Sequence, residues 1–242
     1  MEEAVELVNY LPYSYRDKRE QEYISFVWEA FEFNYLNEKY EFANLAFHLL
    51  YMSYVSFSVW QIRSMRRLDF EKAMVGFQSG VENKILSAIT PFEFYEHLKE
   101  ANIFRFLKLI GCSNEHVGEF SKFVKRRNKI AHPSGDIFFN DKASMDDHVY
   151  EVIKEVNNIQ GHMRPIIEEI YYHFLLDNHD REAWQYSLAS DQITGMLIHN
   201  NYLSNKDIET CLDYDIRQLT SHKHYETIKE LHDSLIAEYK ED

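Results

Sequence analysis

Helix-breaking residues are rare in this chain, and their scarcity limits what it can fold into. Only 7 glycines and 4 prolines occur among 242 residues, and long stretches contain neither. Sandwiches and barrels need frequent turns, which glycine and proline usually build, whereas long helices with short connections need few. The sequence therefore predicts an all-α protein.

The longest apolar run of the chain covers residues 39–65. Its apolar side chains fall around most of the helical circumference, which predicts the central helix of a bundle. Asn44, His48 and several serines and tyrosines interrupt the run. A buried core helix therefore explains it better than a membrane span, and we expect no membrane contact. We interpret His48 as a core residue whose polar atoms are satisfied.

Helical spacing of apolar residues predicts about six main helices between residues 1 and 176, arranged as a helical bundle. The composition changes at residues 177–180, which read Asp-Asn-His-Asp, and the following residues are more polar. We therefore predict a helical C-terminal extension over residues 177–242. Histidines in this extension match no known metal-ligand spacing and are interpreted as surface residues: His179, His222, His224 and His232.

Net charge and cysteine content restrict the environment and the partners. The formal net charge of -14 repels nucleic acid across most of the surface, so any contact with RNA must be local. Cys112 and Cys211 are too few and too far apart for a disulfide framework or a cysteine-based zinc site. Because no secretory signal opens the chain, we expect a cytoplasmic protein.

One segment, Glu119 to Pro133, departs from this acidic background. Its basic side chains stand between positions 122 and 129 with no acid among them: Lys122, Lys125, Arg126, Arg127 and Lys129. Such a cluster in an acidic protein indicates an anionic ligand. Pro133 disfavours helical geometry at the preceding residue, so a helix through this segment should end at about His132. The imidazole would then lie at a helix C-terminus, facing a cleft.

The sequence from Arg127 to His132 is an arginine, four residues and a histidine, with the polar Asn128 directly after the arginine. This resembles the active-site motif of HEPN-superfamily ribonucleases. The resemblance implies a helical bundle that acts as a homodimer and cuts RNA around a shared cleft, with no metal and no cofactor. It also implies a toxin or an antiviral defence effector, with a protein antitoxin or regulator as a further partner.

The resemblance also implies roles for individual residues. His132 would act in acid–base chemistry on the ribose 2′-hydroxyl or on the leaving oxygen, and Arg127 would stabilise the charged transition state. The product would carry a 2′,3′-cyclic phosphate. In a helix Arg127 and His132 lie about 140° apart, whereas Asn128 shares the face of His132 and could orient its ring or a phosphate. The remaining basic residues would contact the substrate backbone: Lys122, Lys125, Arg126 and Lys129.

A second interpretation fits the same residues. A solvated basic helix face with a histidine at its C-terminus is a common arrangement that the helix dipole favours. The chain would then be a catalytically silent helical interaction or scaffold module. A nucleotide or second-messenger sensor that uses the same basic helix is a third class, and it would need a closed pocket.

Overall fold

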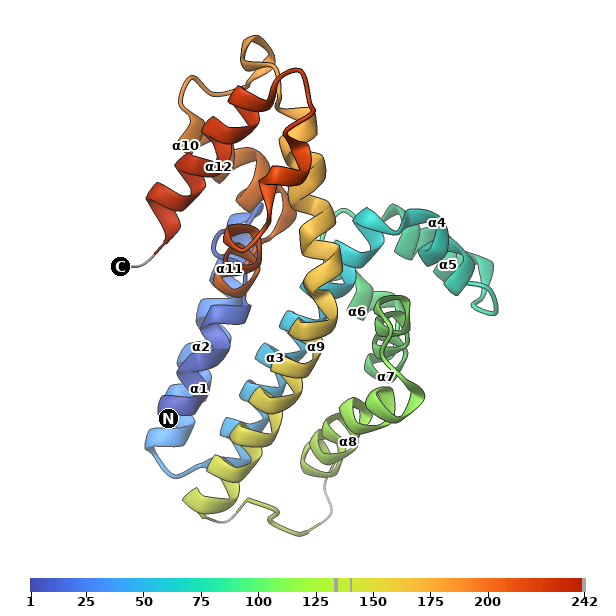
Figure 1. Cartoon of the computed structure of the whole chain (residues 1–242). Coiled ribbons are helices and arrows are strands. Elements are labelled where there is room, and N and C mark those ends of the chain that lie inside the picture. Colours follow the sequence, from blue (N-terminus) through green and yellow to red (C-terminus); the bar gives the residue numbers. More distant parts are fainter. Residues whose placement is uncertain (133–134, 140, 241–242) are drawn as a thin grey trace. The chain divides into compact units, whose positions relative to one another are not determined.

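The computed structural model describes residues 1–132, 135–139 and 141–240, and this part of the chain is all-α (Figure 1). The fold class predicted from the sequence is confirmed. Within the described residues there are no strands, and the only sheet-like pairs are two isolated bridges, Pro12 with Ser204 and Val75 with Phe77.

Contacts between Cα atoms divide the chain into two compact units. Unit 1 comprises residues 1–8 and 17–163, and unit 2 comprises residues 9–16 and 164–242. The division falls inside one long helix, α9, beside Pro165. The boundary at residues 176 and 177 that composition suggests stays a prediction.

Unit 1 holds most of the helices, both long and short. They are α1 (Glu2–Val5), α2 (Lys18–Leu36), α3 (Tyr40–Met65), α4 (Arg67–Ala73), α5 (Ser79–Ser87), α6 (Glu93–His97), α7 (Glu100–Ile103), a 3-10 helix (Phe104–Ile110), α8 (Asn114–Ala131) and the first part of α9 (Lys142–Asp177). A further 3-10 helix, Glu6–Tyr10, follows α1.

The central helix of unit 1 is α3, as its apolar run predicts. Every residue from 50 to 63 is buried, and α2, α7 and α8 all contact this helix. By length and composition α3 could also cross a membrane, but 83% of its most apolar window is buried inside the protein, as in a core helix. His48 on α3 is buried, and its Nε2 lies 3.1 Å from Glu100 Oε2, which agrees with its interpretation as a satisfied core residue.

The ends of α8 follow from local sequence. At its start, the Ser113 side chain accepts a hydrogen bond from the backbone N–H of His116. At its end, His132 is the C-cap residue and has extended backbone angles. The predicted end of this helix at about His132 is therefore confirmed, while Pro133 lies outside the described residues.

Unit 2 contains the C-terminal part of α9 and the helices after it. These are a 3-10 helix (Arg181–Ala183), α10 (Ala189–Gln192), a π-helix (Ile193–His199), α11 (Asn205–Leu212), a 3-10 helix (Ile216–Leu219) and α12 (Tyr225–Tyr239). The prediction that His232 lies at the surface is wrong. It is buried on the inner face of α12, with its Nδ1 2.8 Å from the Tyr171 hydroxyl, because its position continues the apolar stripe of Ile228, Leu231 and Leu235.

Arg63, near the end of α3, is a buried cation that secures the end of α5. Its guanidinium donates to the carbonyl oxygens of Ile85 at 2.8 Å and Ala88 at 3.0 Å. It also lies 3.9 Å from the ring centre of Trp60. Carbonyls in the last turn of a helix have no partner within the helix, so Arg63 satisfies two groups that would otherwise be buried without a donor.

We predict that Arg63→Met lowers the free energy of unfolding by about 2–4 kcal/mol, because it leaves those two carbonyls unpaired and removes the cation–π contact. Urea denaturation measures this change. The matched control is Arg67→Met, whose guanidinium pairs with Glu71 at the surface and should matter by less than about 1 kcal/mol. Equal losses in the two variants would contradict this account of Arg63.

Candidate functional site

His132, the histidine of the predicted site, is exposed at the C-terminal end of α8. It lines an open hollow of about 480 Å³ together with Lys125, Asn128, Lys129 and Phe138. The imidazole is therefore accessible to a ligand that approaches along α8.

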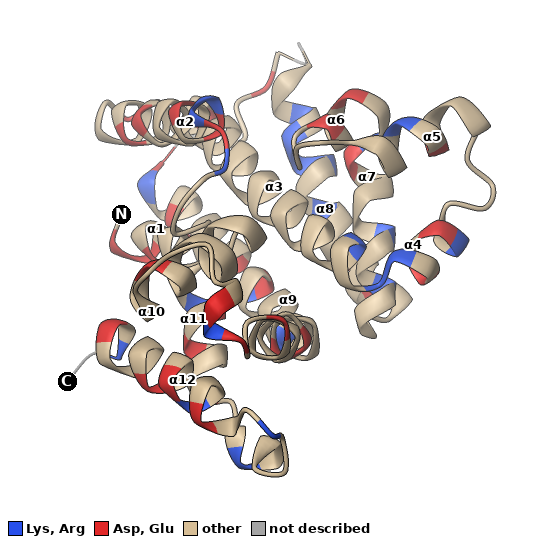
Figure 2. Ribbon diagram, turned by 90° about the horizontal axis from the view of Figure 1, so that it is seen from above, with Lys and Arg blue, Asp and Glu red and all other residues tan. Residues whose placement is uncertain are grey.

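A second hollow, of about 520 Å³, lies along the same helix. Its lining includes the side chains that we call the basic face of α8: Lys122, Lys125, Arg126 and Lys129. The two hollows share Lys125, Lys129 and Phe138, so they form one continuous surface that leads to His132. Figure 2 shows basic segments on α8, whereas α2 and α12 carry both acidic and basic segments.

Arg126 is held in place by residues of α9. Its Nη1 donates to Glu151 Oε2 at 2.8 Å and lies 2.5 Å from His148 Nδ1. Burial, and after it the charge of Arg126, lowers the pKa of His148 to about 3. The neutral imidazole can therefore accept a hydrogen bond from the guanidinium. Within the basic face, Arg126 is thus partly neutralised, and Lys125 and Lys129 carry charge that the described ion pairs leave uncompensated.

Arg127 points to another side of α8. It lines a separate hollow of about 730 Å³ with Glu100, Asn128 and residues of α3 and α6. Its Nη2 forms an ion pair with Glu100 Oε1. Of the predicted site residues, Asn128 alone among those described lines both this hollow and that of His132. One chain therefore does not bring Arg127 and His132 into the same hollow, in line with their angular separation on a helix.

Glu100 is the centre of a charged group that packs α7 against α3 and α8. Its two carboxylate oxygens receive hydrogen bonds from Arg127 and from His48. Burial alone would raise the pKa of Glu100, but the hydrogen bonds from His48 and Arg127 outweigh it and lower the pKa to about 2. Burial lowers the pKa of His48, so its imidazole is neutral and donates through Nε2. The charge of Arg127 is therefore balanced by Glu100.

One nitrogen of the Arg127 guanidinium has an N–H group without an acceptor in the part of the chain that the structure describes. Its Nε is buried and has no hydrogen-bond partner among the described residues. A buried donor without a partner is unusual and costs free energy. Arg127 is therefore tied at one end of its guanidinium and unsatisfied at the other.

Sequence reasoning did not identify Glu100 and His148 as parts of this site. Glu100 is 27 positions before Arg127, and His148 is 22 positions after Arg126. Neither residue belongs to a motif, and their proximity to α8 results from the packing of α7 and α9. The only sequence signal for this network was the position of His48 inside an apolar run, which predicted a buried imidazole with a partner.

Comparison with models of known protein families, with curated proteins and with solved structures found no match to this chain. The resemblance to HEPN ribonucleases therefore depends on the motif from Arg127 to His132 and on the all-α fold.

We predict that Glu100→Gln destabilises the protein by up to about 3 kcal/mol at pH 7, because it removes a carboxylate whose pKa falls from its ordinary value of about 4.5 to about 2 on folding. A lowered pKa stabilises the folded state above pH 4.5, and this stabilisation is lost as the pH falls through about 2. The difference between parent and variant should therefore shrink by more than half at pH 3.

Urea denaturation at pH 7 and pH 3 measures both effects. The control is Glu151→Gln, because Glu151 also pairs with an arginine of α8 but is more than half exposed. It should change the free energy of unfolding by less than about 1 kcal/mol. A pH-independent loss in Glu100→Gln would contradict the assigned ionisation of Glu100.

Proposed function

We propose that this protein binds RNA along the basic face of α8 and cleaves it without a metal ion, with His132 as the acid–base residue. The observation that carries the proposal is the continuous hollow that joins Lys125 and Lys129 to the exposed imidazole of His132. Lysine ammonium groups along a groove suit a phosphate backbone, and the adjoining Phe138 offers a ring on which a base can stack.

The proposed reaction uses only groups of the chain and the substrate. His132 takes the proton of a ribose 2′-hydroxyl, and the 2′-oxygen attacks the adjacent phosphorus. The bond from phosphorus to the 5′-oxygen breaks, and the imidazolium formed at His132 returns the proton to that oxygen as it leaves. The products are a 2′,3′-cyclic phosphate and a 5′-hydroxyl. Histidine suits this work because its ordinary pKa is near neutrality.

The HEPN resemblance supplies the proposed role of Arg127. In a homodimer two α8 helices would surround one cleft, and Arg127 would stabilise charge that develops on the phosphate. Arg127 also lines a hollow beside Asn128, which supports this role because a phosphate in that hollow could meet the guanidinium. Asn128 lies between the two hollows and would contact the same phosphate group.

A second function, RNA binding without cleavage, is supported by a different observation. Arg127 is paired with Glu100 and lies in a different hollow from His132. An arginine whose charge is already balanced contributes less to a transition state. In this alternative the chain is the silent interaction module, and the basic face alone defines its ligand.

We predict that the purified protein cuts a mixed pool of tRNA and mRNA in the presence of EDTA and leaves cyclic phosphate ends. His132→Ala should lower the cleavage rate by about 100-fold or more, because acid–base catalysis contributes on that scale. The matched control is His173→Ala, another exposed histidine, which should cut at the parental rate. Equal cutting by the parent and His132→Ala would exclude His132, and binding without cutting by the parent would favour the silent module.

The binding step has its own prediction. The double variant Lys125→Gln/Lys129→Gln should weaken binding of a single-stranded RNA and reduce the slope of log affinity against log salt by about 1.4, since two phosphate contacts are lost. The control Lys18→Gln/Lys72→Gln removes the same charge from exposed lysines elsewhere and should leave the slope unchanged. Fluorescence anisotropy at several salt concentrations measures both. Equal slopes in the two double variants would place RNA outside the basic face.

A further inference from the structure

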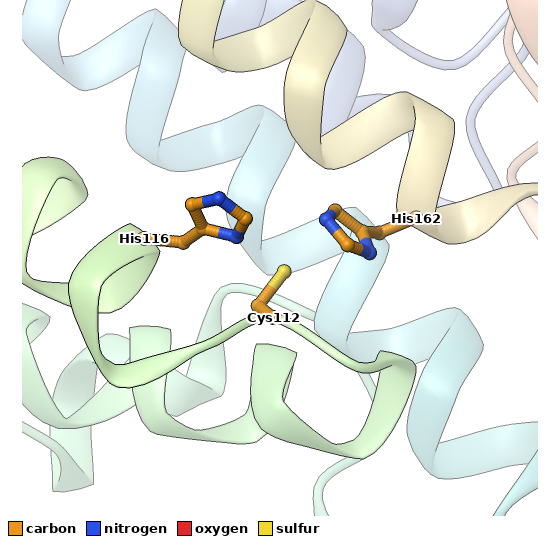
Figure 3. A group of neighbouring side chains, drawn as sticks. All are labelled: Cys112, His116 and His162. Atoms are coloured by element: carbon orange, nitrogen blue, oxygen red, sulfur yellow. The ribbon is translucent and has the colours of Figure 1, made fainter.

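Three residues that no motif connects meet in unit 1, between the start of α8 and α9 (Figure 3). Cys112 directly precedes the N-cap residue of α8, and His116 lies in the first turn of that helix. His162 comes from α9. One potential ligand atom of each residue lies within 4.8 Å of the other two, and Figure 3 shows the thiol and both imidazoles pointing toward a common space.

The group leaves a polar atom unsatisfied. His116 Nδ1 is buried and has no hydrogen-bond partner among the described residues. The rings of His116 and His162 lie 5.4 Å apart between centres, so they are close without a hydrogen bond that satisfies this nitrogen. Buried nitrogen atoms of side chains nearly always have a partner, so an orphaned one calls for a water molecule, a ligand or an ion that the protein does not itself supply.

Other uses of Cys112 fit less well. Its side chain is buried. A reactive cysteine needs access to solvent, which Cys112 lacks. Cys112 and Cys211, the other cysteine, are both buried and free.

One thiolate and two imidazoles form a donor set that suits Zn²⁺. Zinc bonds of about 2.0–2.1 Å to nitrogen and 2.3 Å to sulfur place tetrahedral ligands roughly 3.3–3.6 Å apart. The observed separations of up to 4.8 Å need a contraction of about 1 Å, which rotation of partly exposed histidines can supply. We infer that Cys112, His116 and His162 bind one Zn²⁺ ion.

The fourth position of this site would be open to solvent. His162 also lines a surface hollow of about 510 Å³ with Lys154, Asn157, Asn158 and Gly161. We expect a water molecule to complete the tetrahedron of the ion.

The zinc ion would fasten α8 to α9 rather than take part in RNA cleavage. His132 is 16 positions after His116, which corresponds to about 24 Å along a helix. The ion holds the first turn of α8, whereas the proposed RNA site lies at the opposite end of the helix. The inference is therefore independent of the proposed function, and it revises the expectation from the sequence that the chain holds no metal.

Cobalt provides the first test, because a cysteine thiolate bound to Co²⁺ gives a charge-transfer absorption that imidazole ligands alone do not. The full-length, reduced and metal-free protein should show this absorption, saturate at one Co²⁺ per chain, and lose it when Zn²⁺ is added. Cys112→Ala should abolish the absorption and raise the dissociation constant for Zn²⁺ by at least about 100-fold. His162→Asn, at a partly exposed position, should weaken Zn²⁺ binding by a similar factor.

The matched control is Cys211→Ala, which removes the other buried thiol and should retain the absorption and the affinity. Histidines 179, 222 and 224 of unit 2 have ring centres 4.7–5.9 Å apart and could bind cobalt, but without the thiolate signal. Thermal unfolding gives a second readout, because Zn²⁺ should raise the unfolding temperature of the parent and of Cys211→Ala but not of Cys112→Ala. Absence of the thiolate signal in the parent, or its persistence in Cys112→Ala, would overturn the inference.

Discussion

The burial of α3 on all sides is the constraint on which the rest of unit 1 depends. A helix whose residues from 50 to 63 are all buried cannot be covered by one neighbour, so α2, α7 and α8 pack around it. The polar groups that α3 carries into this core must then find partners inside it. Arg63 satisfies the end of α5, Tyr54 donates to the Val156 carbonyl of α9, and His48 donates to Glu100.

The packing of α8 on α3 explains why the basic residues of this one helix lie in different surroundings. Phe120, Phe123 and Val124 face the core, so the basic residues of the segment are distributed over the remaining circumference. Those at Lys125 and Lys129 face solvent beside His132. Arg127 falls at the edge of the buried stripe, where a charge without a partner would be costly, and Glu100 provides that partner.

Patterns that are local in the sequence were sufficient to predict the fold class, the central helix and the end of α8. Each depends on apolar spacing or on proline, which act within a few residues. The partners of α8 could not be predicted in this way. Glu100, His148 and His162 belong to other helices, and only tertiary packing brings them to α8. The burial of His232 could not be predicted from residue type either, because its position in the apolar stripe of α12, and not the polarity of its ring, decides that it is buried.

With the proposed zinc ion bound, both ends of α8 would be tied to other elements of unit 1, and this bears on how an acidic protein can hold an anion. Near the C-terminal end, Arg126 is anchored to α9 by Glu151 and His148. Near the N-terminal end, Cys112 and His116 lie against His162 of the same helix. A helix fixed at two points keeps its lysines in one geometry, so fewer side chains must be ordered when a phosphate chain binds. In a chain with a net charge of -14, such preorganisation lets a few cations compete with long-range repulsion.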